Sequence, residues 1–356
     1  MAEPAKKFLI VKLSSLGDVV HGLPFLRTLR VNFPAAHIAW AVEEKCKDVL
    51  YQNPDLDELI VVRSKKWRKD LGRQSLGELL DFVRLLRQRR FDAVFDLQGL
   101  IKSGLIAFLS RAPLRVGFHP RDCRERLNAW FTNRKGAFAG KGRHVVDKNL
   151  SLLNAVGARS FVKEFPLAVP AEAEAYIADY FKNNPDLAAG PLAAVNPGAG
   201  FQTKRWDLKR FAQLADRIAG ELGCNVLLTW GPGEEDLVKA ISANMRQNHR
   251  IAPPTGIHQS IALLRRMHLF VSCDTGPLHL CAALNVPTVS IFGPTDPARN
   301  GPYGNNHETV YKSLPCSFRY KRKCPTHNEC MDQVTVDQAF AAVRKSFSIH
   351  VKVLAI

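Results

Sequence analysis

The order of apolar and polar positions along the chain predicts strands that alternate with helices. Short apolar runs predict strands at 7–12, 37–42, 59–62, 92–97 and 114–117. Helical periodicity predicts helices at 18–32, 75–90, 100–110, 123–132 and 145–156. In LGELLDFVRLLRQRR, for example, apolar residues recur every three or four positions with arginines opposite them. Strands followed by helices indicate a parallel sheet with helices on both faces.

The pattern pauses between residues 160 and 190 and then restarts. This stretch has prolines near both ends and an alanine-rich helical segment between them, which predicts a domain boundary. Further strands are expected at 191–195, 225–230, 268–273 and 287–292, and helices at 207–222, 234–246, 258–266, 277–285 and 335–347. We therefore expect an α/β chain with two Rossmann-like doubly wound domains, whose ligands bind at the carboxyl ends of strands.

The domain boundaries follow from this pattern. We place the domains at residues 1–170 and 191–334, with 171–190 as a linker. The last segment, 335–356, is expected to pack back toward the first domain. With 356 residues and 46% hydrophobic residues, each domain can bury a core of its own.

Composition and charge restrict the cellular setting and the partner. The first apolar run is short and interrupted by Lys12, so it reads as a strand rather than a signal peptide. No apolar run approaches the ~20 residues of a transmembrane helix, so a cytoplasmic protein is expected. The net charge is +17, and residues 63–148 carry 21 Lys and Arg against 8 Asp and Glu. This excess predicts an anionic partner, either nucleic acid, a membrane surface or a phosphorylated substrate.

The stretch VSCDTGPLHLCAALNVPTVSIFGPTDP is the most informative part of the chain. A predicted strand runs into Asp274, Thr275 and Gly276, and a helix follows. The free N–H groups of a helix N-terminus attract anions, and Gly276 lets a phosphate approach the backbone. His279, one turn later, and the second strand that ends in FGPTDP favour a ligand site over a helix that is merely well capped.

Two further loops follow predicted strands. In VNPGAGFQTKRW, Gly200 and Lys204 suit a diphosphate that is held by backbone N–H groups and a point charge. In TWGPGEED, Glu234 or Glu235 can accept hydrogen bonds from a ribose, although an acidic first helical turn explains them equally well. Neither a Walker loop nor G-x-G-x-x-G follows a predicted strand, which disfavours a nicotinamide dehydrogenase.

A lone carboxylate, Asp18, stands in the first loop, VKLSSLGDVVHGLP. After the Ser-Ser-Leu-Gly turn it suits the N-cap of the following helix. If phosphates bind in the second domain, the strand at 7–12 would also deliver Asp18 to the opposite wall of the site. His21, one turn later, could orient the carboxylate.

Eight motifs, taken in order, resemble those of the ADP-heptose:lipopolysaccharide heptosyltransferases, glycosyltransferase family 9. They are VKLSSLGDVVHGLP, WAVEE, KKWRK, DLQGLIKSG, RERLNAWFTNRK, KRW, WGPGEE and DTGPLHLCAALNVPTVSIFGPTDP. The most similar branch is heptosyltransferase I, which acts on Kdo-lipid A. The resemblance implies a GT-B fold, in which an N-terminal acceptor domain and a C-terminal nucleotide-sugar domain face a central cleft. It also implies an inverting transfer that needs no metal for chemistry.

The resemblance implies a role for each candidate residue. Asp18 would be the general base, with Ser15 and Gly17 beside the acceptor. The donor, ADP-heptose, would be held by Gly200, Lys204, Thr275 and Gly276 at the diphosphate, by Glu235 at the ribose, and by Asp274 and His279 near the sugar. The carboxylates and phosphates of Kdo-lipid A would meet Arg63, Arg68, Lys102 and Arg124. No cofactor is expected.

The cysteines fall into two groups. CSFRYKRKCPTHNECM departs from the heptosyltransferase I pattern, so the exact branch stays open. Its Cys316, Cys324, His327 and Cys330 could ligate a structural Zn or Fe, or the cysteines could be reduced thiols in a basic loop. The remaining cysteines, at 46, 123, 224, 273 and 281, are typical of small buried apolar residues and not of a disulfide scaffold.

The basic first half now has two expected partners, Kdo-lipid A and the anionic inner face of the cytoplasmic membrane. We expect a monomer that associates peripherally with the inner membrane, with Trp67 and Trp130 either at the interface or packed in the fold. One alternative keeps the fold and changes the nucleotide-sugar or the heptosyl acceptor. A more remote alternative is a nucleic-acid-binding protein, but the basic half has few aromatics for base stacking, so no nucleic-acid partner is expected.

Overall fold

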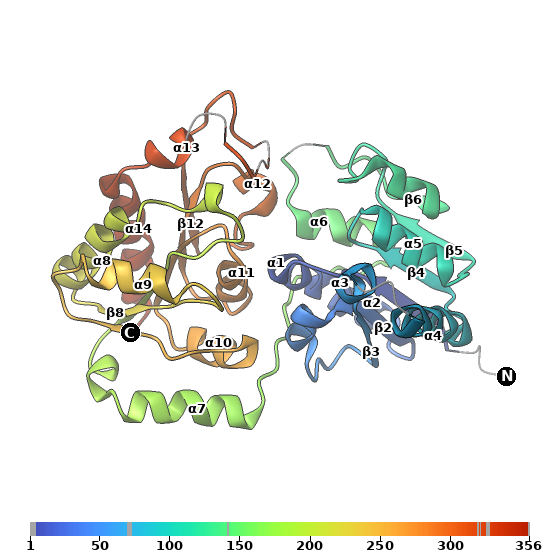
Figure 1. The fold of residues 1–356 in the computed structure, drawn as a ribbon, viewed down its shortest axis with the longest axis horizontal. Coiled ribbons are helices and arrows are strands. Elements are labelled where there is room, and N and C mark those ends of the chain that lie inside the picture. Colours follow the sequence, from blue (N-terminus) through green and yellow to red (C-terminus); the bar gives the residue numbers. More distant parts are fainter. Residues whose placement is uncertain are drawn as a thin grey trace. The chain divides into compact units, whose positions relative to one another are not determined.

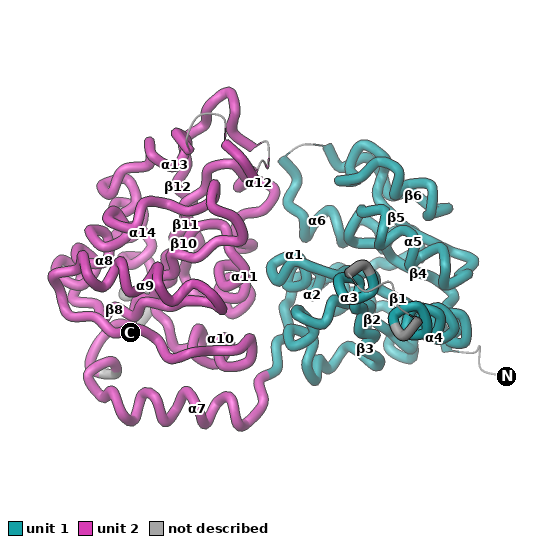
Figure 2. Tube along the Cα trace, viewed as in Figure 1, with its two compact units in different colours: residues 1–168 teal, residues 169–356 magenta. Residues whose placement is uncertain are grey.

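The computed structural model describes residues 5–69, 73–140, 142–318, 320, 322–324 and 328–354. The chain divides into two compact units, residues 1–168 (teal in Figure 2) and residues 169–356 (magenta). Within the described residues, each unit contains one six-stranded sheet, and the paired strands are parallel (Figure 1). The predicted α/β class with two Rossmann-like halves is therefore confirmed.

Unit 1 has the strand order β3-β2-β1-β4-β5-β6. Its strands are β1 (Lys7–Val11), β2 (His37–Glu43), β3 (Glu58–Val62), β4 (Ala93–Asp96), β5 (Leu114–Gly117) and β6 (Arg134–Lys135). Its helices are α1 (Leu16–Val20), α2 (Leu23–Asn32), α3 (Ser64–Lys69), α4 (Arg73–Arg89), α5 (Ile101–Leu109) and α6 (Val145–Leu150), with 3-10 turns η1 (Glu44–Leu50), η2 (Arg126–Phe131) and η3 (Ser151–Val156).

The alternation of β1 side chains explains why helices cover both faces of this sheet. Leu9 and Val11 join a buried cluster with Phe82 and Leu86 of α4 and with Ile106 of α5. The intervening β1 residues are also buried, and on the other face the rings of Phe8 and Phe25 each lie edge-on to Phe95. Strands buried on both sides read as continuous apolar runs, which is why the sequence predicted them well.

Unit 2 has the strand order β12-β11-β10-β7-β8-β9. Its strands are β7 (Leu192–Asn196), β8 (Asn225–Leu228), β9 (His249–Ile251), β10 (Leu269–Cys273), β11 (Thr288–Phe292) and β12 (His307–Tyr311). Its helices are α7 (Ala171–Lys182), α8 (Leu208–Leu222), α9 (Glu235–Ser242), α10 (Ile257–Leu264), α11 (Gly276–Ala283), α12 (Pro297–Asn300), α13 (Glu329–Asp332) and α14 (Val336–Leu354), with 3-10 turns η4 (Pro185–Ala188) and η5 (Gln202–Lys204).

Two expected boundaries differ from the structure. Helix α7, expected in a linker at 171–190, belongs to unit 2 and packs beside α10, where Glu174 pairs with Arg265 and Tyr176 donates to the Pro254 carbonyl. Helix α14, expected to pack back toward the first domain, also belongs to unit 2 (Figure 2). Its buried Phe340 and Val343 complete the core of that unit, because they cover the same sheet face as α8.

The described part of the chain holds no helix that combines the length and the apolar character needed to cross a bilayer.

Candidate functional site

Each sheet has its topological switch point beside its first strand. In unit 1 the chain adds β2 and β3 on one side of β1 and then β4, β5 and β6 on the other, so the switch lies between β1 and β4. In unit 2 the corresponding position lies between β7 and β10. Open α/β sheets bind ligands at this position, outside the carboxyl ends of the strands. The loops after β1, β7 and β10 carry residues that the sequence singled out.

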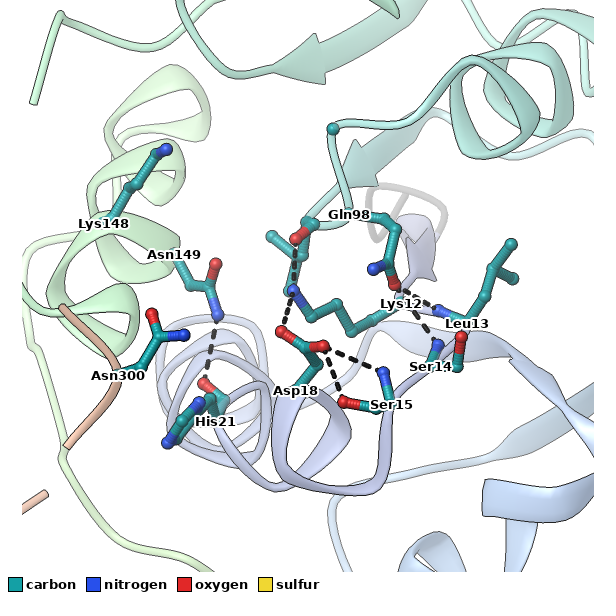
Figure 3. Close-up of polar contacts among 12 residues, drawn as sticks. Lys12, Leu13, Ser14, Ser15, Asp18, His21, Gln98, Lys148, Asn149 and Asn300 are labelled. Carbon is teal, nitrogen blue, oxygen red and sulfur yellow. Dashed lines mark hydrogen bonds and ion pairs between the residues drawn. The ribbon is translucent and has the colours of Figure 1, made fainter. Parts of the chain in front are cut away.

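Asp18 lies on the short helix α1, directly after the loop that follows β1 (Figure 3). One carboxylate oxygen accepts hydrogen bonds from the Ser15 N–H and hydroxyl, both at 2.9 Å. The other lies 3.6 Å from the Lys12 ammonium. Asp18 is therefore not the N-cap that the sequence suggested: Ser15 occupies that position and Asp18 reaches back to it from the third helical residue.

Lys12 is the buried partner of this carboxylate. Its side chain is 3% exposed, whereas that of Asp18 is 39% exposed. The Lys12 ammonium also donates to the Leu97 carbonyl at 2.7 Å, and the Gln98 side-chain oxygen accepts from the Leu13 and Ser14 N–H groups (Figure 3). The loops after β1 and β4 thus hold each other, and they leave Asp18 fixed in direction and open to solvent.

A buried carboxylate, Asp96, fixes the second of these loops. It ends β4, is fully buried, and accepts hydrogen bonds from the Gln98 and Gly99 N–H groups, the Ser103 hydroxyl and the Asn128 amide. Burial raises the pKa of Asp96 even though these hydrogen bonds lower it. Its place beneath the loop shows a structural role.

The predicted acceptor residues lie at or near the carboxyl edge of the first sheet. Lys102 on α5 pairs at 3.0 Å with Glu43, the last residue of β2, and Arg63 directly after β3 pairs at 3.3 Å with Glu44. Arg124 is exposed in the segment beside Gly99. Arg68 lies on α3. Near Asp18, Ser15 is exposed and Gly17 is buried in the first turn of α1.

His21 follows α1 and is buried. Its ring lies edge-on to His144 with a centroid distance of 5.3 Å, and its carbonyl accepts from Asn149 at 3.1 Å (Figure 3). These contacts tie α1 to α6, so the helix that carries Asp18 is anchored at both ends.

In unit 2, Lys204 and Asp274 meet at the switch point. The Lys204 ammonium lies 2.6 Å from one oxygen of Asp274, and the same oxygen accepts from the Thr295 hydroxyl at 2.7 Å. The other oxygen lies 3.5 Å from His279 Nε2. Three predicted donor residues, Lys204, Asp274 and His279, are thereby brought together.

The ionisation of Asp274 follows from these contacts. Burial by itself would raise the pKa of Asp274, but the contact with His279 and the charge of Lys204 outweigh it and hold the pKa well below its ordinary value. Asp274 is therefore a carboxylate at neutral pH. It holds the Lys204 ammonium next to the N-terminus of α11, where Thr275 is the N-cap residue.

The N-terminus of α11 adds backbone donors to this cluster. Thr275 is the N-cap residue, its side chain makes no cap hydrogen bond, and Gly276 and Pro277 open the helix. Across the switch point, the loop after β7 is shaped by Asn196, whose side chain accepts from the Gly198 N–H and donates to Thr229. A side chain on Gly200 would meet nothing within 4 Å. Backbone N–H groups next to an ammonium group can bind a diphosphate.

The two candidate ribose acids have different surroundings. Glu235 opens α9, is half exposed and pairs at 2.9 Å with Lys239 one turn later. Glu234 reaches back over the loops instead: it accepts from the Gly231 N–H at 3.1 Å, and a Cβ on Gly198 would lie 2.1 Å from its carboxylate. Glu234 thus adjoins the loop after β7, an approach that only the three-dimensional structure reveals.

The cysteine segment is only partly described. His327 of the expected ligand set lies outside the described residues. Cys330 is buried, while Cys316 and Cys324 are partly exposed, and the Cys324 sulfur accepts from the Asn328 N–H at 3.2 Å. Burial raises the pKa of the Cys330 thiol, and Cys324 and Cys316 raise it further. Considering the described residues alone, no three His, Cys, Asp or Glu side chains are grouped so as to hold a metal ion. The other five cysteines are buried free thiols, as predicted.

Sequence reasoning did not find the partners Lys12 and Thr295. A lysine inside a predicted buried strand was one indication, because a buried ammonium requires a partner. Thr295 stands in FGPTDP, directly after the predicted strand at 287–292. Lys12 lies six residues before Asp18 and Thr295 lies 21 residues after Asp274, and neither spacing corresponds to a local pattern that pairs the two side chains.

Comparison with known proteins identifies related chains. A family model described as Glycosyltransferase family 9 (heptosyltransferase) matches residues 79–329. Lipopolysaccharide heptosyltransferase 1 of Pseudomonas aeruginosa is 31% identical over 326 residues, which cover 89% of this chain and 87% of that protein. Lipopolysaccharide heptosyltransferase 1 of Escherichia coli K12 is also 31% identical, over 84% of this chain and 92% of that protein.

Solved structures agree with these relatives. E. coli heptosyltransferase WaaC with ADP-2-deoxy-2-fluoro heptose has a TM-score of 0.72 and 26% identity, over 95% of this chain and 99% of that chain. A family 9 glycosyltransferase from Veillonella parvula DSM 2008 has a TM-score of 0.82 over 98% of this chain and 99% of that chain. At 23% identity, this second likeness concerns the fold alone.

Proposed function

Because the chain belongs to glycosyltransferase family 9, the heptosyltransferases, we propose that it transfers a heptose from ADP-heptose to the Kdo-lipid A inner core of lipopolysaccharide. The family expected from the eight motifs is confirmed, and so is the GT-B fold. The relatives named lipopolysaccharide heptosyltransferase 1 support the acceptor, and the WaaC structure that holds an ADP-heptose analogue supports the donor.

The observation that carries the mechanism is a carboxylate that is fixed yet open to solvent. Asp18 is held by Ser15 and Lys12 and remains 39% exposed. A sugar hydroxyl is a poor nucleophile, and a carboxylate within hydrogen-bond reach can accept its proton as the new glycosidic bond forms. Asp18 is the general base in this proposal, with Ser15 and Gly17 beside the acceptor. The Lys12 ammonium, 3.6 Å away, keeps the carboxylate directed.

The departing ADP is stabilised from unit 2. Negative charge builds up on the diphosphate as the glycosidic bond to heptose breaks, and preorganised donors aimed at that charge lower the barrier. Lys204 supplies an ammonium, Gly200, Thr275 and Gly276 supply backbone N–H groups, and Glu235 accepts from the ribose. Asp274 holds Lys204 in place and contacts His279, and both Asp274 and His279 lie near the sugar. A single displacement inverts the anomeric carbon, so no second nucleophile is required.

The acceptor is bound by the basic side chains of unit 1. Guanidinium and ammonium groups suit the carboxylates of Kdo and the phosphates of lipid A. Lys102 and Arg63 are held by Glu43 and Glu44 near the carboxyl edge of the sheet, and Arg124 and Arg68 complete the set. An acceptor anchored in the inner membrane fits a monomer that works in the cytoplasm at the inner face of that membrane.

The test measures ADP release and heptosylated lipid after incubation with ADP-heptose and Kdo-lipid A. Asp18→Asn should lower kcat by about 10²–10⁴-fold, because the base is lost while the shape of the side chain is kept. Its affinity for ADP-heptose should stay unchanged. Asp81→Asn, which alters an exposed carboxylate on α4, is the matched control and should retain wild-type kcat.

The alternatives within the fold are another nucleotide-sugar or another heptosyl acceptor. A panel of nucleotide-sugars with mass-spectrometric detection of product separates them. Turnover by Asp18→Asn at the wild-type rate would refute the base assignment, and product only from a different donor would refute the proposed substrate.

A further inference from the structure

A band of exposed apolar side chains lies on α5 and η2 of unit 1. Ile101, Leu105 and Phe108 recur every three or four residues, so they share one helix face, and they are 39%, 42% and 51% exposed. On η2, Leu127 is 48% exposed and Trp130 is 81% exposed, the highest value of any large apolar side chain in the described part. These five residues are called the α5–η2 face below.

The two elements form one preorganised surface. Gly104 lets them approach closely, because a Cβ there would lie 2.7 Å from the Asn128 amide and 2.9 Å from the Phe131 ring. Asn128 also donates to the Leu100 carbonyl at 2.7 Å, and the Phe108 and Phe131 rings lie edge-on at 6.1 Å. The exposure of the α5–η2 face is therefore a fixed property of the fold.

Basic residues accompany this apolar face. Residues 101–135 contain eight Lys and Arg against two Asp and Glu, an excess of six. Arg111, Arg126 and Arg134 are exposed, and the Arg115 guanidinium lies 5.7 Å from the centre of the Phe108 ring. An exposed tryptophan and leucines among arginines are typical of a surface that meets the headgroup region of an anionic bilayer.

The excess charge decides between a bilayer and a second copy of the chain. A twofold dimer would place the same patch against itself, so the exposed arginines beside the two faces would meet. Like charges across an interface oppose association. An anionic lipid surface instead neutralises the arginines while its acyl region takes up the apolar side chains.

We propose that the α5–η2 face docks this protein on the surface of an anionic lipid bilayer. Leu105, Leu127 and Trp130 enter the interfacial region, and the arginines contact lipid phosphates. The inference rests on the proposed function in one respect: an acceptor anchored in the same bilayer explains why a glycosyltransferase needs such a surface. Lys102 on α5 and Arg124 just before η2 would then stand at headgroup level, where the acceptor sugars emerge.

The test is sedimentation with vesicles of phosphatidylethanolamine and phosphatidylglycerol, compared with vesicles of phosphatidylcholine alone. The triple variant Leu105→Ser/Leu127→Ser/Trp130→Ser should lose about 10- to 100-fold in affinity for the anionic vesicles. Val31→Ser/Phe161→Ser, which changes exposed apolar residues elsewhere on unit 1, is the matched control and should bind like wild type. Circular dichroism checks that each variant is folded.

Charge and fluorescence supply independent readouts. Arg126→Gln/Arg134→Gln should weaken binding and flatten its salt dependence, whereas Lys182→Gln/Lys209→Gln in unit 2 should not. Vesicles should shift the tryptophan emission of the wild type to shorter wavelength. Trp130→Ser should remove most of that shift, because Trp40 and Trp206 are buried, and Trp67 and Trp230 are only partly exposed and donate hydrogen bonds within the fold.

The outcomes separate this inference from the proposed function. Wild-type vesicle binding by the triple variant would overturn the inference, and so would self-association in light scattering that the triple variant abolishes. Equal heptose transfer by the triple variant and wild type to a deacylated, water-soluble acceptor, with loss of transfer only to vesicle-embedded acceptor, would support it. Failure of the wild type to transfer heptose to either acceptor would refute the proposed function alone.

Discussion

The ion pair between Lys204 and Asp274 offers a quantitative test of how much a buried ion pair contributes to the stability of unit 2. The Asp274 side chain is 7% exposed and has three partners, the Lys204 ammonium at 2.6 Å, the Thr295 hydroxyl at 2.7 Å and His279 at 3.5 Å. Asp274→Asn keeps the shape and an accepting oxygen but leaves the Lys204 ammonium, itself only 15% exposed, without its counter-ion. Breaking a buried pair from one side costs about 3–5 kcal/mol.

The expected loss in the free energy of unfolding can be converted into a shift of the urea unfolding midpoint. We expect Asp274→Asn to lower the free energy of unfolding by about 3 kcal/mol, the lower end of this range, because Lys204 retains some contact with water. With a urea slope of about 2 kcal/mol per M, the unfolding midpoint of unit 2 should fall by about 1.5 M. Fluorescence of Trp206, which is buried in the core of unit 2, reports this transition. Glu174→Gln, which breaks an exposed pair with Arg265 in the same unit, should cost at most about 1 kcal/mol.

A double-mutant cycle isolates the pair itself. Lys204→Met combined with Asp274→Asn should cost less than the sum of the single changes, by about 1–3 kcal/mol. Additive losses, or a midpoint within about 0.3 M of wild type for Asp274→Asn, would refute the reasoning.

The same pair gives stability a definite pH dependence. The pKa of Asp274 is lowered in the folded state, so below its ordinary value of 3.8 the unfolded chain binds more protons than the folded chain. The stabilisation is therefore complete above about pH 5 and decreases as the pH falls through 4 toward the lowered pKa. The midpoint difference between wild type and Asp274→Asn should shrink over that range, and a difference independent of pH would contradict the assignment.

Three further predictions concern the chemistry and the fold. Lys12→Met should lower kcat and leave the affinity for ADP-heptose unchanged, because the ammonium that orients the Asp18 carboxylate is gone; a wild-type kcat would oppose this role. Chelation by EDTA should leave heptose transfer intact if Lys204 and the α11 N-terminus stabilise the diphosphate, and loss of activity restored by a metal would refute this. Gly104→Ala should destabilise unit 1 by about 1–3 kcal/mol in urea unfolding, because its methyl group would crowd Asn128. Gly77→Ala, which meets nothing within 4 Å on the helix α4, should be neutral or stabilising.

The sequence predicted the inner strands of both sheets and the edge strand β3, whereas it missed the other three edge strands. Strands β1, β4, β7 and β10 are buried on both faces and form apolar runs. The missed strands, β6, β9 and β12, all lie at sheet edges and include polar sequences such as RK and HRI. The predicted helix at 18–32 is two helices, α1 and α2, with His21 and Gly22 between them.

The sequence predicted those site residues whose position follows from the direction of the strands. Asp18, Gly200 and Thr275 all follow buried strands, and the carboxyl ends of parallel strands share one edge of the sheet. Partners were not predictable. Lys12 meets Asp18 because the loop after β1 turns back over the buried Lys12 side chain, and Thr295 meets Asp274 from the loop after β11, 21 residues away. The first pair depends on the path of the loop and the second on β10 and β11 being neighbours, and local patterns carry neither.

The two units use one electrostatic arrangement with opposite signs. At the switch point of unit 1, a lysine that is 3% exposed lies beneath a carboxylate that is 39% exposed. At the switch point of unit 2, an aspartate that is 7% exposed holds a lysine that is 15% exposed. In each pair the less exposed charge has a second anchor, the Leu97 carbonyl for Lys12 and the Thr295 hydroxyl for Asp274. Burying a charge costs free energy, and the buried charge of each pair offsets this cost by fixing the direction of the outer charge. In the proposed function, the outer carboxylate, Asp18, is the base and the outer ammonium, Lys204, is the cation that stabilises the departing diphosphate.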